Sequence, residues 1–455
     1  MLSYWINIRI LNSGKQSKNI IGKVDVPLLG LFLVLVFAGL LTVYSASFSE
    51  EYPQIYSLDK AYGKQLAWIV ISLIIGLLIL TLEGSFIRNS AYIVYGVVTL
   101  MLFVVLFMPA IKGAHSWFKI GGFTIQPSEF AKFATSLAIA HFLSTTGIKI
   151  QETKTKLIVF FLIAVPGFFI LQQPDPGTLL VFFSFIFVMY REGLSGNILL
   201  GMFFAIIIGV MAIFFKASEA NVNAFGWVFA ANYLYLLIIL ITTVLIHFGI
   251  TYLVMPRYRG KKYITNIVGG TMALLLVFSC NYAYDTVFKD RHRDRFEVMF
   301  GLKLDRKGVG YNSYQALSAI GSGGPVGKGY FKGTLSNDKY KHVPEQSTDF
   351  IFCSWAEEWG FLGSFLLIIL YTTFLIRIIM IAERQKSKFT RIFGYCTASI
   401  IFFHYMINIA MVIGLAPVIG IPLPFFSKGG SAILGFSIMI FILLRMDSER
   451  KDVLR

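Results

Sequence analysis

The sequence predicts an all-α polytopic membrane protein with about twelve transmembrane helices. Two observations support this fold class. Apolar residues make up 56% of the chain and charged residues only 14%, whereas roughly a quarter of the residues in a soluble domain are charged. Apolar runs of roughly 18 to 25 residues also recur, and each is long enough to cross about 30 Å of hydrocarbon.

The apolar runs give the order of the expected spans. These lie near residues 27–47, 64–82, 91–108, 129–143, 157–171, 178–190, 197–215, 228–250, 264–285, 351–377, 392–413 and 430–446. A cleaved signal peptide is the alternative for the first run, because Ser45-Ala46-Ser47 resembles a cleavage site. The run is too long for a signal peptide, so we expect a retained first helix.

Basic residues in the short loops predict the orientation. One side of the membrane receives Lys149, Lys154, Lys156, Arg257, Arg259, Lys261, Lys262, Arg384, Lys386, Lys388 and Arg391. The positive-inside rule makes this side cytoplasmic, together with the amino-terminal segment 1–25 and the tail 447–455. The acidic loop 48–63 and the large loop 286–350 then face outward, since long loops translocate regardless of charge. We expect one membrane domain, residues 1–455.

Several classes of function are not expected from the composition. The net charge of +16 fits loops that face anionic lipid better than nucleic-acid binding. Cys280, Cys353 and Cys396 are not spaced for a metal site or a disulfide framework. The sequence lacks Asp-x-Asp, His-Glu-x-x-His, Gly-x-Ser-x-Gly and dinucleotide-binding patterns, which argues against a nucleotide-sugar fold, a zinc site and a serine triad.

Asp349 is the strongest candidate for a functional residue. It ends a long polar stretch and directly precedes a new apolar run. A carboxylate at the border of water and hydrocarbon is costly and usually functional. The structural alternative is an N-cap for the helix expected to begin at Phe350, because Asp is a preferred cap. Glu345, four residues upstream, is a second candidate base.

A second candidate region includes Trp117 and the stretch 126–132. Pro127 suits the first position of a helix, and Glu129 suits the first turn, near the positive end of the helix dipole. Lys132 follows three residues later, so the two charges share one helix face. They form either a structural ion pair or a site in which Lys132 faces an anionic substrate.

Asp175 lies in a break between two apolar runs. The stretch 172–178 contains two prolines and a glycine, which interrupt a helix and leave backbone groups that must face protein or a wet cavity. Asp175 either caps the helix that follows or orients a basic partner such as Lys132.

Two glycine-rich stretches are further candidates. Residues 319–329 resemble a phosphate loop but fail the Walker pattern, because Ser322 and Gly329 occupy positions that require Gly and Ser or Thr. Their backbone either cradles a lipid pyrophosphate or forms a plain flexible loop. Residues 414–431, which follow Asn408 and include Ser427, are rich in Gly and Pro and predict a broken or re-entrant segment.

Together and in this order, the motifs resemble the SEDS family, which includes RodA and FtsW proteins. The most specific stretches are 343–352 (VPEQSTDFIF), 356–360 (AEEWG) and 420–431. The resemblance covers roughly residues 27–215 and 285–446. It implies a SEDS-type helical bundle and a peptidoglycan glycosyltransferase that polymerises lipid II on the outer face of the bacterial cytoplasmic membrane. Residues 328–335 (KGYFKGTL) are more similar to RodA, which acts in cell elongation, than to FtsW, which acts in division.

The resemblance also implies roles for single residues and partners. Asp349 would be the catalytic carboxylate, and the substrate-binding residues would be Lys132, Glu129, Trp117, Glu345, Asp175, Ser427 and Lys112. No protein metal site is expected, although Mg²⁺ could assist the departure of the pyrophosphate. The expected partners are lipid II, a class B penicillin-binding protein and other membrane proteins of the elongation complex, with no nucleic acid.

The chain departs from the family pattern in two places. RodA-like proteins have about ten spans, so we expect the extra pair to form a hairpin inserted within residues 216–263. Ser116 precedes the outer-loop Trp where the family often has Arg, so a cationic contact there would have to come from Lys112, Lys119 or His115.

Three other functions remain open at this point. Broken helices and intramembrane charges also describe a transporter that moves lipid II across the bilayer. A division polymerase similar to FtsW and a non-catalytic scaffold for other wall-building proteins are the remaining alternatives. The large outer loop 286–350 carries Asp349, which favours an enzyme that acts on one face of the membrane.

Overall fold

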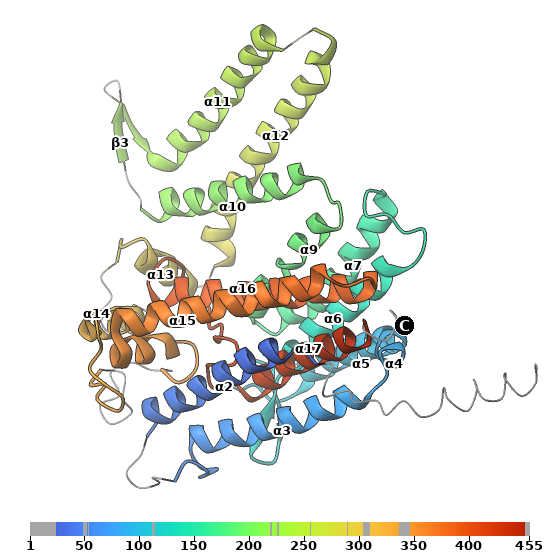
Figure 1. Ribbon diagram of the computed structural model, residues 1–455. Coiled ribbons are helices and arrows are strands. Elements are labelled where there is room, and N and C mark those ends of the chain that lie inside the picture. Colours follow the sequence, from blue (N-terminus) through green and yellow to red (C-terminus); the bar gives the residue numbers. More distant parts are fainter. Residues whose placement is uncertain are drawn as a thin grey trace, which may run out of the picture. The chain divides into compact units, whose positions relative to one another are not determined.

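The computed structural model describes residues 24–48, 52, 54–111, 114–218, 221–224, 227–254, 256–288, 290–303, 310–335 and 346–450, which are mostly helical (Figure 1). The helices in the first half are α2 (Val26–Ala46), α3 (Ala61–Thr81), α4 (Gly84–Asn89), α5 (Ala91–Val104), η2 (Val105–Phe107), α6 (Pro127–Ser144), α7 (Thr153–Gln172), α8 (Pro176–Phe182), α9 (Phe185–Arg191) and α10 (Gly196–Ala217). Those in the second half are α11 (Ala231–Leu253), α12 (Pro256–Tyr282), η3 (Ala283–Val287), α13 (Asp290–Met299), α14 (Tyr311–Gly323), α15 (Ile351–Glu383), α16 (Lys388–Val412) and α17 (Gly430–Arg450).

The fold is that of an all-α polytopic membrane protein. Each of the twelve expected spans falls mostly on helical residues, although the span expected at 228–250 begins within a strand, residues 227–230. Within the described residues, nine helices are long and apolar enough to cross a membrane. The apolar helical stretches Ala91–Phe107 and Pro176–Arg191 are shorter, and α6 is more polar because it contains Glu129 and Lys132.

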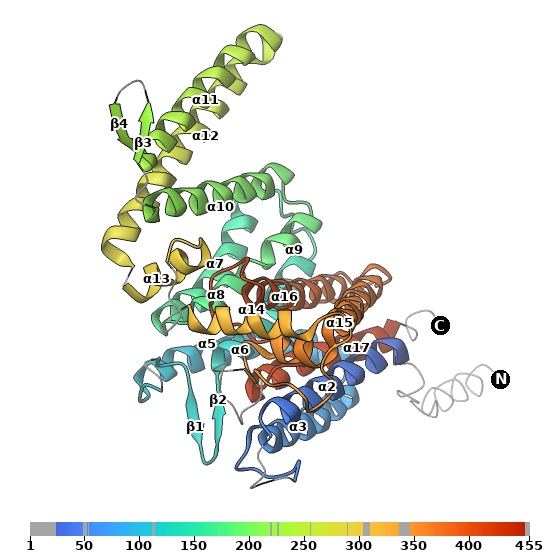
Figure 2. The same ribbon diagram turned by 90° about the vertical axis from the view of Figure 1, so that its left-hand side faces the viewer.

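Strands contribute little to the described part of the chain. The hairpin of β1 (Phe118–Ile120) and β2 (Phe123–Ile125) is antiparallel, with Phe118 opposite Ile125 (Figure 2). A second hairpin joins β3 (Asn221–Ala224) to β4 (Trp227–Ala230). The first hairpin directly precedes α6 and therefore connects Trp117 to the helix that carries Lys132.

Contacts divide the chain into two compact units. The first comprises Met1–Val188, Phe365–Tyr405 and Pro422–Arg455. Within it, α17 packs against α3 and α6, α2 against α3, and α5 against α6. The helix α17 is buried along most of its length, so it forms the centre of this unit. The side chain of Phe32 on α2 packs edge-on against Phe425 and Phe441, with ring centroids 5.1 and 5.7 Å away.

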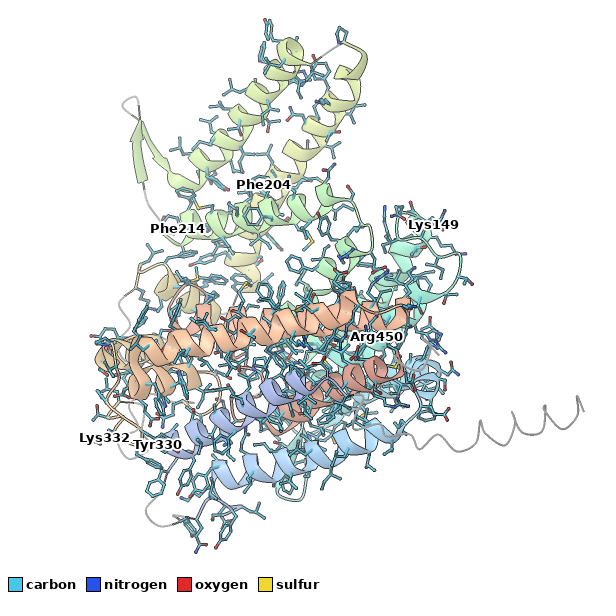
Figure 3. The ribbon with its side chains drawn as sticks, viewed as in Figure 1. Lys149, Phe204, Phe214, Tyr330, Lys332 and Arg450 are labelled. Atoms are coloured by element: carbon cyan, nitrogen blue, oxygen red, sulfur yellow. The ribbon has the colours of Figure 1, made fainter. Side chains whose placement is uncertain are left out.

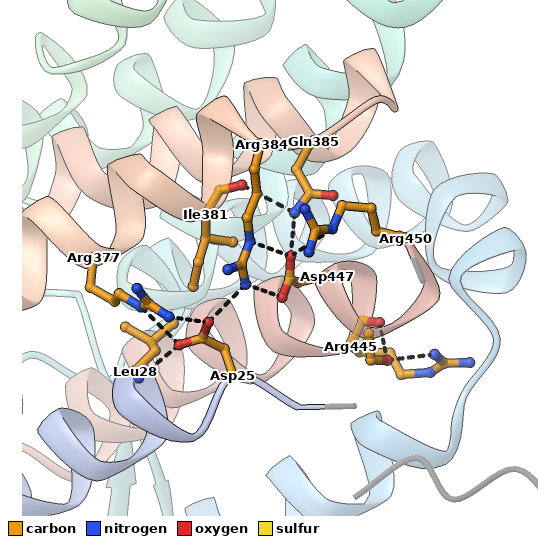
Figure 4. A network of polar contacts seen from close by, with 10 residues as sticks. Asp25, Leu28, Arg377, Ile381, Arg384, Gln385, Arg445, Asp447 and Arg450 are labelled. Atoms are coloured by element: carbon orange, nitrogen blue, oxygen red, sulfur yellow. Dashed lines mark hydrogen bonds and ion pairs between the residues drawn. The ribbon is translucent and has the colours of Figure 1, made fainter. Parts of the chain in front are cut away.

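Ion pairs join three helices at one end of the first unit (Figure 4). Asp25 caps α2 by accepting the Leu28 N–H at 3.0 Å. Its carboxylate also accepts hydrogen bonds from Arg377 (Nη2, 2.7 Å) and Arg384 (Nη2, 2.8 Å) at the end of α15. Arg384 pairs in turn with Asp447 on α17. Because both carboxylates are buried, they require these cations.

The second unit comprises Met189–Ser364 and Met406–Ile421. Within it, α11 packs along α12, and both contact α10. Ala212, Ile239 and Val277, one from each of these helices, form a small buried core. The expected hairpin at 216–263 therefore covers α11 and the start of α12. Its status as an insertion relative to the family stays a prediction.

Candidate functional site

Asp349 lies in the turn that leads into α15. Its side chain is half-buried, and the next residue, Phe350, is fully buried. The backbone carbonyl of Asp349 accepts a hydrogen bond of 2.8 Å from the side-chain amide of Asn408 on α16. The backbone of Asp349 is thus hydrogen-bonded to a residue of α16 that lies 59 positions later in the chain. The alternative role, an N-cap of α15, stays a prediction.

Gly420 lies directly against the carboxylate of Asp349. A Cβ built on this glycine would come within 3.2 Å of Asp349 Oδ2. Gly420 also has φ +83°, a conformation that disfavours residues with a Cβ. Both properties require glycine here, and both bring the backbone close to the acid. The glycine-rich stretch 414–431 therefore does reach the candidate catalytic residue, as a segment without regular helix between α16 and α17.

Asn408 connects the two parts of this site. Its Nδ2 donates to the carbonyl of Ile421 at 2.7 Å as well as to that of Asp349. The side chain is fully buried. The amide thus joins the turn before α15 to the segment after α16, and it places Gly420 beside Asp349.

Lys132 is at the centre of a separate buried cluster in the first unit. Its ammonium lies 2.7 Å from Glu129 Oε2 and 2.8 Å from His404 Nε2. It also lies 4.6 Å from the ring centroid of Phe436. A carboxylate, an imidazole lone pair and an aromatic face all favour a cation. The expected pairing on one helix face is confirmed, and Pro127 is the first residue of α6 as predicted.

His404 is a member of this cluster that sequence reasoning missed. It is 1% exposed, and its Nδ1 lies 3.3 Å from the carbonyl of Pro422. Because Nε2 accepts from the Lys132 ammonium, the ring proton is on Nδ1, where it can be donated to Pro422. The missed signal was an ionisable residue inside the apolar run 392–413, a position that is functional by default.

Asp175 caps α8, as one of its two predicted roles required. Its carboxylate accepts the backbone N–H and the hydroxyl of Thr178, at 3.1 and 2.8 Å. The side chains of Gln126 and Ser128 also donate to it, at 2.8 and 3.3 Å. The helix break is where the prolines and glycine predicted it. Lys132 bonds to Glu129 and His404 instead, so Asp175 orients the start of α6 through Gln126 and Ser128.

The segment that contains Ser116 and Trp117 is tied to this same helix break. Ser116 is buried, and its hydroxyl donates to the carbonyl of Gln173 at 3.0 Å. Trp117 is half-buried beside it. Of the three cationic substitutes, His115 and Lys119 are exposed, whereas Lys112 lies outside the described residues.

Ser427 and Glu345 are the other predicted substrate contacts. Ser427 is buried; its hydroxyl accepts the Leu423 N–H at 2.8 Å, and its carbonyl accepts a hydrogen bond from Gln65 at 3.1 Å. These contacts hold the turn before α17 in place. Contact of Ser427 with a substrate stays a prediction. Glu345 lies outside the described residues.

The glycine-rich stretch 319–329 packs against α15. The N–H groups of Lys328 and Gly329 donate to the carbonyls of Glu357 and Glu358, at 3.1 and 2.9 Å. These carbonyls are available because α15 is kinked at Gly360, where φ is +66°. These two N–H groups bond to protein and are not available to a pyrophosphate; whether the rest of the stretch cradles one stays a prediction.

Glu357 fixes the loop that follows this stretch. It is fully buried, and its Oε1 accepts from Lys328 Nζ at 2.6 Å and from the N–H groups of Thr334 and Leu335 at 2.9 and 3.0 Å. Tyr330 and Lys332 lie on the same loop (Figure 3). The carboxylate of Glu357 is thus structural.

No group of three His, Cys, Asp or Glu side chains that could hold a metal ion occurs in the part of the chain that the structure describes. Participation of Mg²⁺, which one or two carboxylates and the substrate phosphates can hold, stays a prediction.

Comparison with known proteins gives one family. Residues 26–228 and 227–452 match the model of the FtsW/RodA/SpoVE family, described as cell cycle proteins. The peptidoglycan glycosyltransferase RodA of Treponema pallidum is 26% identical over 433 residues, which cover 94% of this chain and 98% of that protein. The peptidoglycan glycosyltransferase MrdB of Escherichia coli K12 is 28% identical over 429 residues, 94% of each chain.

Solved structures share the fold. A chain from a structure described as "Structural coordination of polymerization and crosslinking by a peptidoglycan synthase complex" superposes with a TM-score of 0.65 at 23% identity, covering 94% of this chain and 98% of that one. The rod shape determining protein RodA of Thermus thermophilus superposes with a TM-score of 0.56 at 21% identity, covering 94% and 97%.

Proposed function

The chain belongs to the FtsW/RodA/SpoVE family of cell cycle proteins, and from this premise we propose that it is a peptidoglycan glycosyltransferase. It polymerises lipid II into glycan strands on the outer face of the bacterial cytoplasmic membrane during cell elongation. Relatives named as glycosyltransferases that align over 94% of this chain support the activity. The relatives named RodA and MrdB support the elongation role, as do residues 328–335, which resemble RodA.

The position of Asp349 supports a specific chemical role for this residue. Asp349 is a half-buried carboxylate at the end of the large polar loop, and its position is fixed by Asn408 and Gly420. A general base must be held within hydrogen-bond reach of the proton that it removes. The hydrogen bond from Asn408 on α16 restrains the backbone of Asp349, which meets this requirement better than an unrestrained loop would.

The reaction joins two lipid-linked saccharides. A hydroxyl of the acceptor sugar attacks the anomeric carbon of the donor, and Asp349 accepts the hydroxyl proton as the new C–O bond forms. The bond between the anomeric carbon and the pyrophosphate oxygen breaks, and the lipid pyrophosphate leaves with the electron pair. This leaving group is a weak base, so it needs no general acid of the kind a glycosidase supplies. Nearby cations stabilise the developing charge.

Lys132 is our first candidate for a cation that binds the pyrophosphate. An ammonium has three N–H donors, of which Glu129 and His404 take two. The third can be donated to a pyrophosphate oxygen. Trp117, Asp175, Ser427, Glu345 and Lys112 complete the proposed substrate-binding set. Of these, Trp117 offers an aromatic surface, and Asp175 acts through the start of α6.

The proposal includes an orientation and partners. Both termini lie in the cytoplasm, and the loop that ends at Asp349 lies outside, because the short basic loops mark the cytoplasmic side. A class B penicillin-binding protein crosslinks the strands that this chain makes, and other membrane proteins of the elongation complex assemble with it. The hairpin within 216–263 is an addition to a family core of about ten spans.

A polymerisation assay tests the function. The purified chain, alone and with its candidate penicillin-binding partner, is supplied with lipid II, and glycan polymer is measured for wild type, Asp349→Asn and Glu345→Gln. We expect polymer from wild type, a reduced amount from Glu345→Gln because Glu345 belongs to the proposed binding set, and none from Asp349→Asn, since Asn cannot accept the proton. Polymer from Asp349→Asn together with its loss in Glu345→Gln would transfer the role of base to Glu345.

A lipid II transporter is the second candidate function, because α7 and α8 are separated by a proline break and α16 and α17 by a non-helical segment. Such interrupted helices are typical of transporter binding sites. Movement of lipid II across vesicles by the purified chain, without polymer under conditions in which a control polymerase is active, would favour this function.

A further inference from the structure

The side chain of Asn408 links the turn of Asp349 to the stretch before Pro422. Its single NH₂ group donates to two backbone carbonyls, those of Asp349 and Ile421. An amide nitrogen has two hydrogens to offer, so both are used. Neither carbonyl belongs to the helix that carries Asn408, so the two bonds act between segments.

The two bonds determine the surroundings of the acid. Fixing the carbonyl of Asp349 fixes the backbone from which its carboxylate extends. Fixing Ile421 also fixes its neighbour Gly420, which lies against Asp349 Oδ2. The buried side chain of Asn408 therefore positions both the candidate base, Asp349, and Gly420, which lies against it.

The amide of Asn408 has a cost in folding stability. Asn408 is 0% exposed, and its Oδ1 has no hydrogen-bond partner among the described residues. A buried acceptor without a partner is destabilising. An apolar residue would avoid this cost but would leave the two carbonyls without their donor, so the useful part of Asn408 is the NH₂ group.

We propose that Asn408 is a positioning residue of the glycosyl transfer reaction, acting through the backbone of Asp349 and through Gly420. The inference rests on the function proposed above. Misplacing a base by about 1 Å can lower a rate by about a hundredfold without weakening substrate binding. The expected signature is therefore a loss in kcat with little change in KM.

The test compares two variants with a matched control. Asn408→Ala removes the donor, and Asn408→Asp keeps the shape but replaces the NH₂ group with an acceptor. Thr397→Ala is the control, because Thr397 is equally buried on α16 and its hydroxyl bonds within that helix, to the carbonyl of Phe393. Polymerisation rates over a series of lipid II concentrations give kcat and KM.

Hydrogen exchange gives a second readout that does not depend on activity. We expect faster exchange in residues 346–352 and 413–421 of both Asn408 variants and unchanged exchange in Thr397→Ala. We expect kcat to fall about ten- to a hundredfold in both variants, with KM within about twofold of the wild-type value.

Wild-type kcat in the Asn408 variants, or unchanged exchange in both segments, would overturn the inference. An inactive wild-type protein would instead contradict the proposed function, and hydrogen exchange would still decide whether Asn408 couples the two segments. If Asn408→Ala does not fold, the isosteric Asn408→Asp decides alone.

Discussion

Lys132 Nζ lies 2.8 Å from His404 Nε2, although the two residues are 272 positions apart in the chain. Both side chains are 1% exposed. With Glu129, they form a buried polar cluster in which a positive charge is matched by a negative charge and an imidazole lone pair. Such clusters are stable only when each member has its partner.

Lys132→Met should therefore destabilise the protein. The substitution leaves the Glu129 carboxylate buried without its cation, which costs about 3–5 kcal/mol. The double variant Lys132→Met/Glu129→Gln should recover part of this loss, because it removes the uncompensated charge. Thermal unfolding in detergent measures both effects. A double variant no more stable than Lys132→Met would contradict the ion-pair interpretation.

His404→Phe should weaken the same cluster by a smaller amount. Phenylalanine retains a ring against Phe436, whose centroid is 4.9 Å from that of His404, but it cannot accept the Lys132 proton. We expect a loss of about 1–3 kcal/mol, typical of a buried donor without a partner. Thr397→Val on the same helix is the control. Equal stabilities of the His404 and Thr397 variants would show that the imidazole nitrogens contribute nothing.

Gly420→Ala should lower activity more than its backbone strain explains. The φ of +83° costs a residue with a Cβ about 1–2 kcal/mol, and the methyl group would also approach Asp349 Oδ2 to 3.2 Å. Gly147→Ala is the matched control, since Gly147 has φ +84° and nothing within 4 Å of its Cβ position. Unfolding temperature and polymerisation rate are measured for both. Similar stability losses with a rate defect only in Gly420→Ala are expected, and equal rates would argue against contact with the acid.

The pH dependence of stability should include a contribution from Asp25. Burial raises the pKa of this carboxyl. Hydrogen bonds from Arg377, the Leu28 N–H and Arg384 lower the pKa, and together they outweigh burial, so the pKa is below the ordinary value of 3.8. A lowered pKa in the folded state stabilises the protein above the unfolded-state pKa, and this stabilisation is lost as the pH falls through the folded-state value.

Asp25→Asn should therefore be less stable than wild type at pH 6, by about 2 kcal/mol, and this difference should shrink below about pH 4. Thermal unfolding between pH 6 and pH 3 measures it, with exposed Asp59→Asn as the control. A difference that stays constant over this range would show that the charge of Asp25 does not contribute.

The sequence by itself determined the class of fold and the local features of the site. Each of the twelve apolar runs is mostly helical, because span formation depends on the hydropathy of neighbouring residues. The Lys132–Glu129 pair and the cap formed by Asp175 were likewise readable, because their partners are three positions apart. Such contacts follow from helix geometry alone.

Only the tertiary structure decided which distant residues meet. His404 joins Lys132, Asn408 joins Asp349 over 59 positions, and Gln65 joins the Ser427 carbonyl over 362. The tertiary structure also shows that the N–H groups of Lys328 and Gly329, in the glycine-rich stretch 319–329, bond to α15 and are not free to bind a phosphate. The physical reason is that helix periodicity and capping involve residues within about four positions, whereas these contacts depend on how whole helices pack.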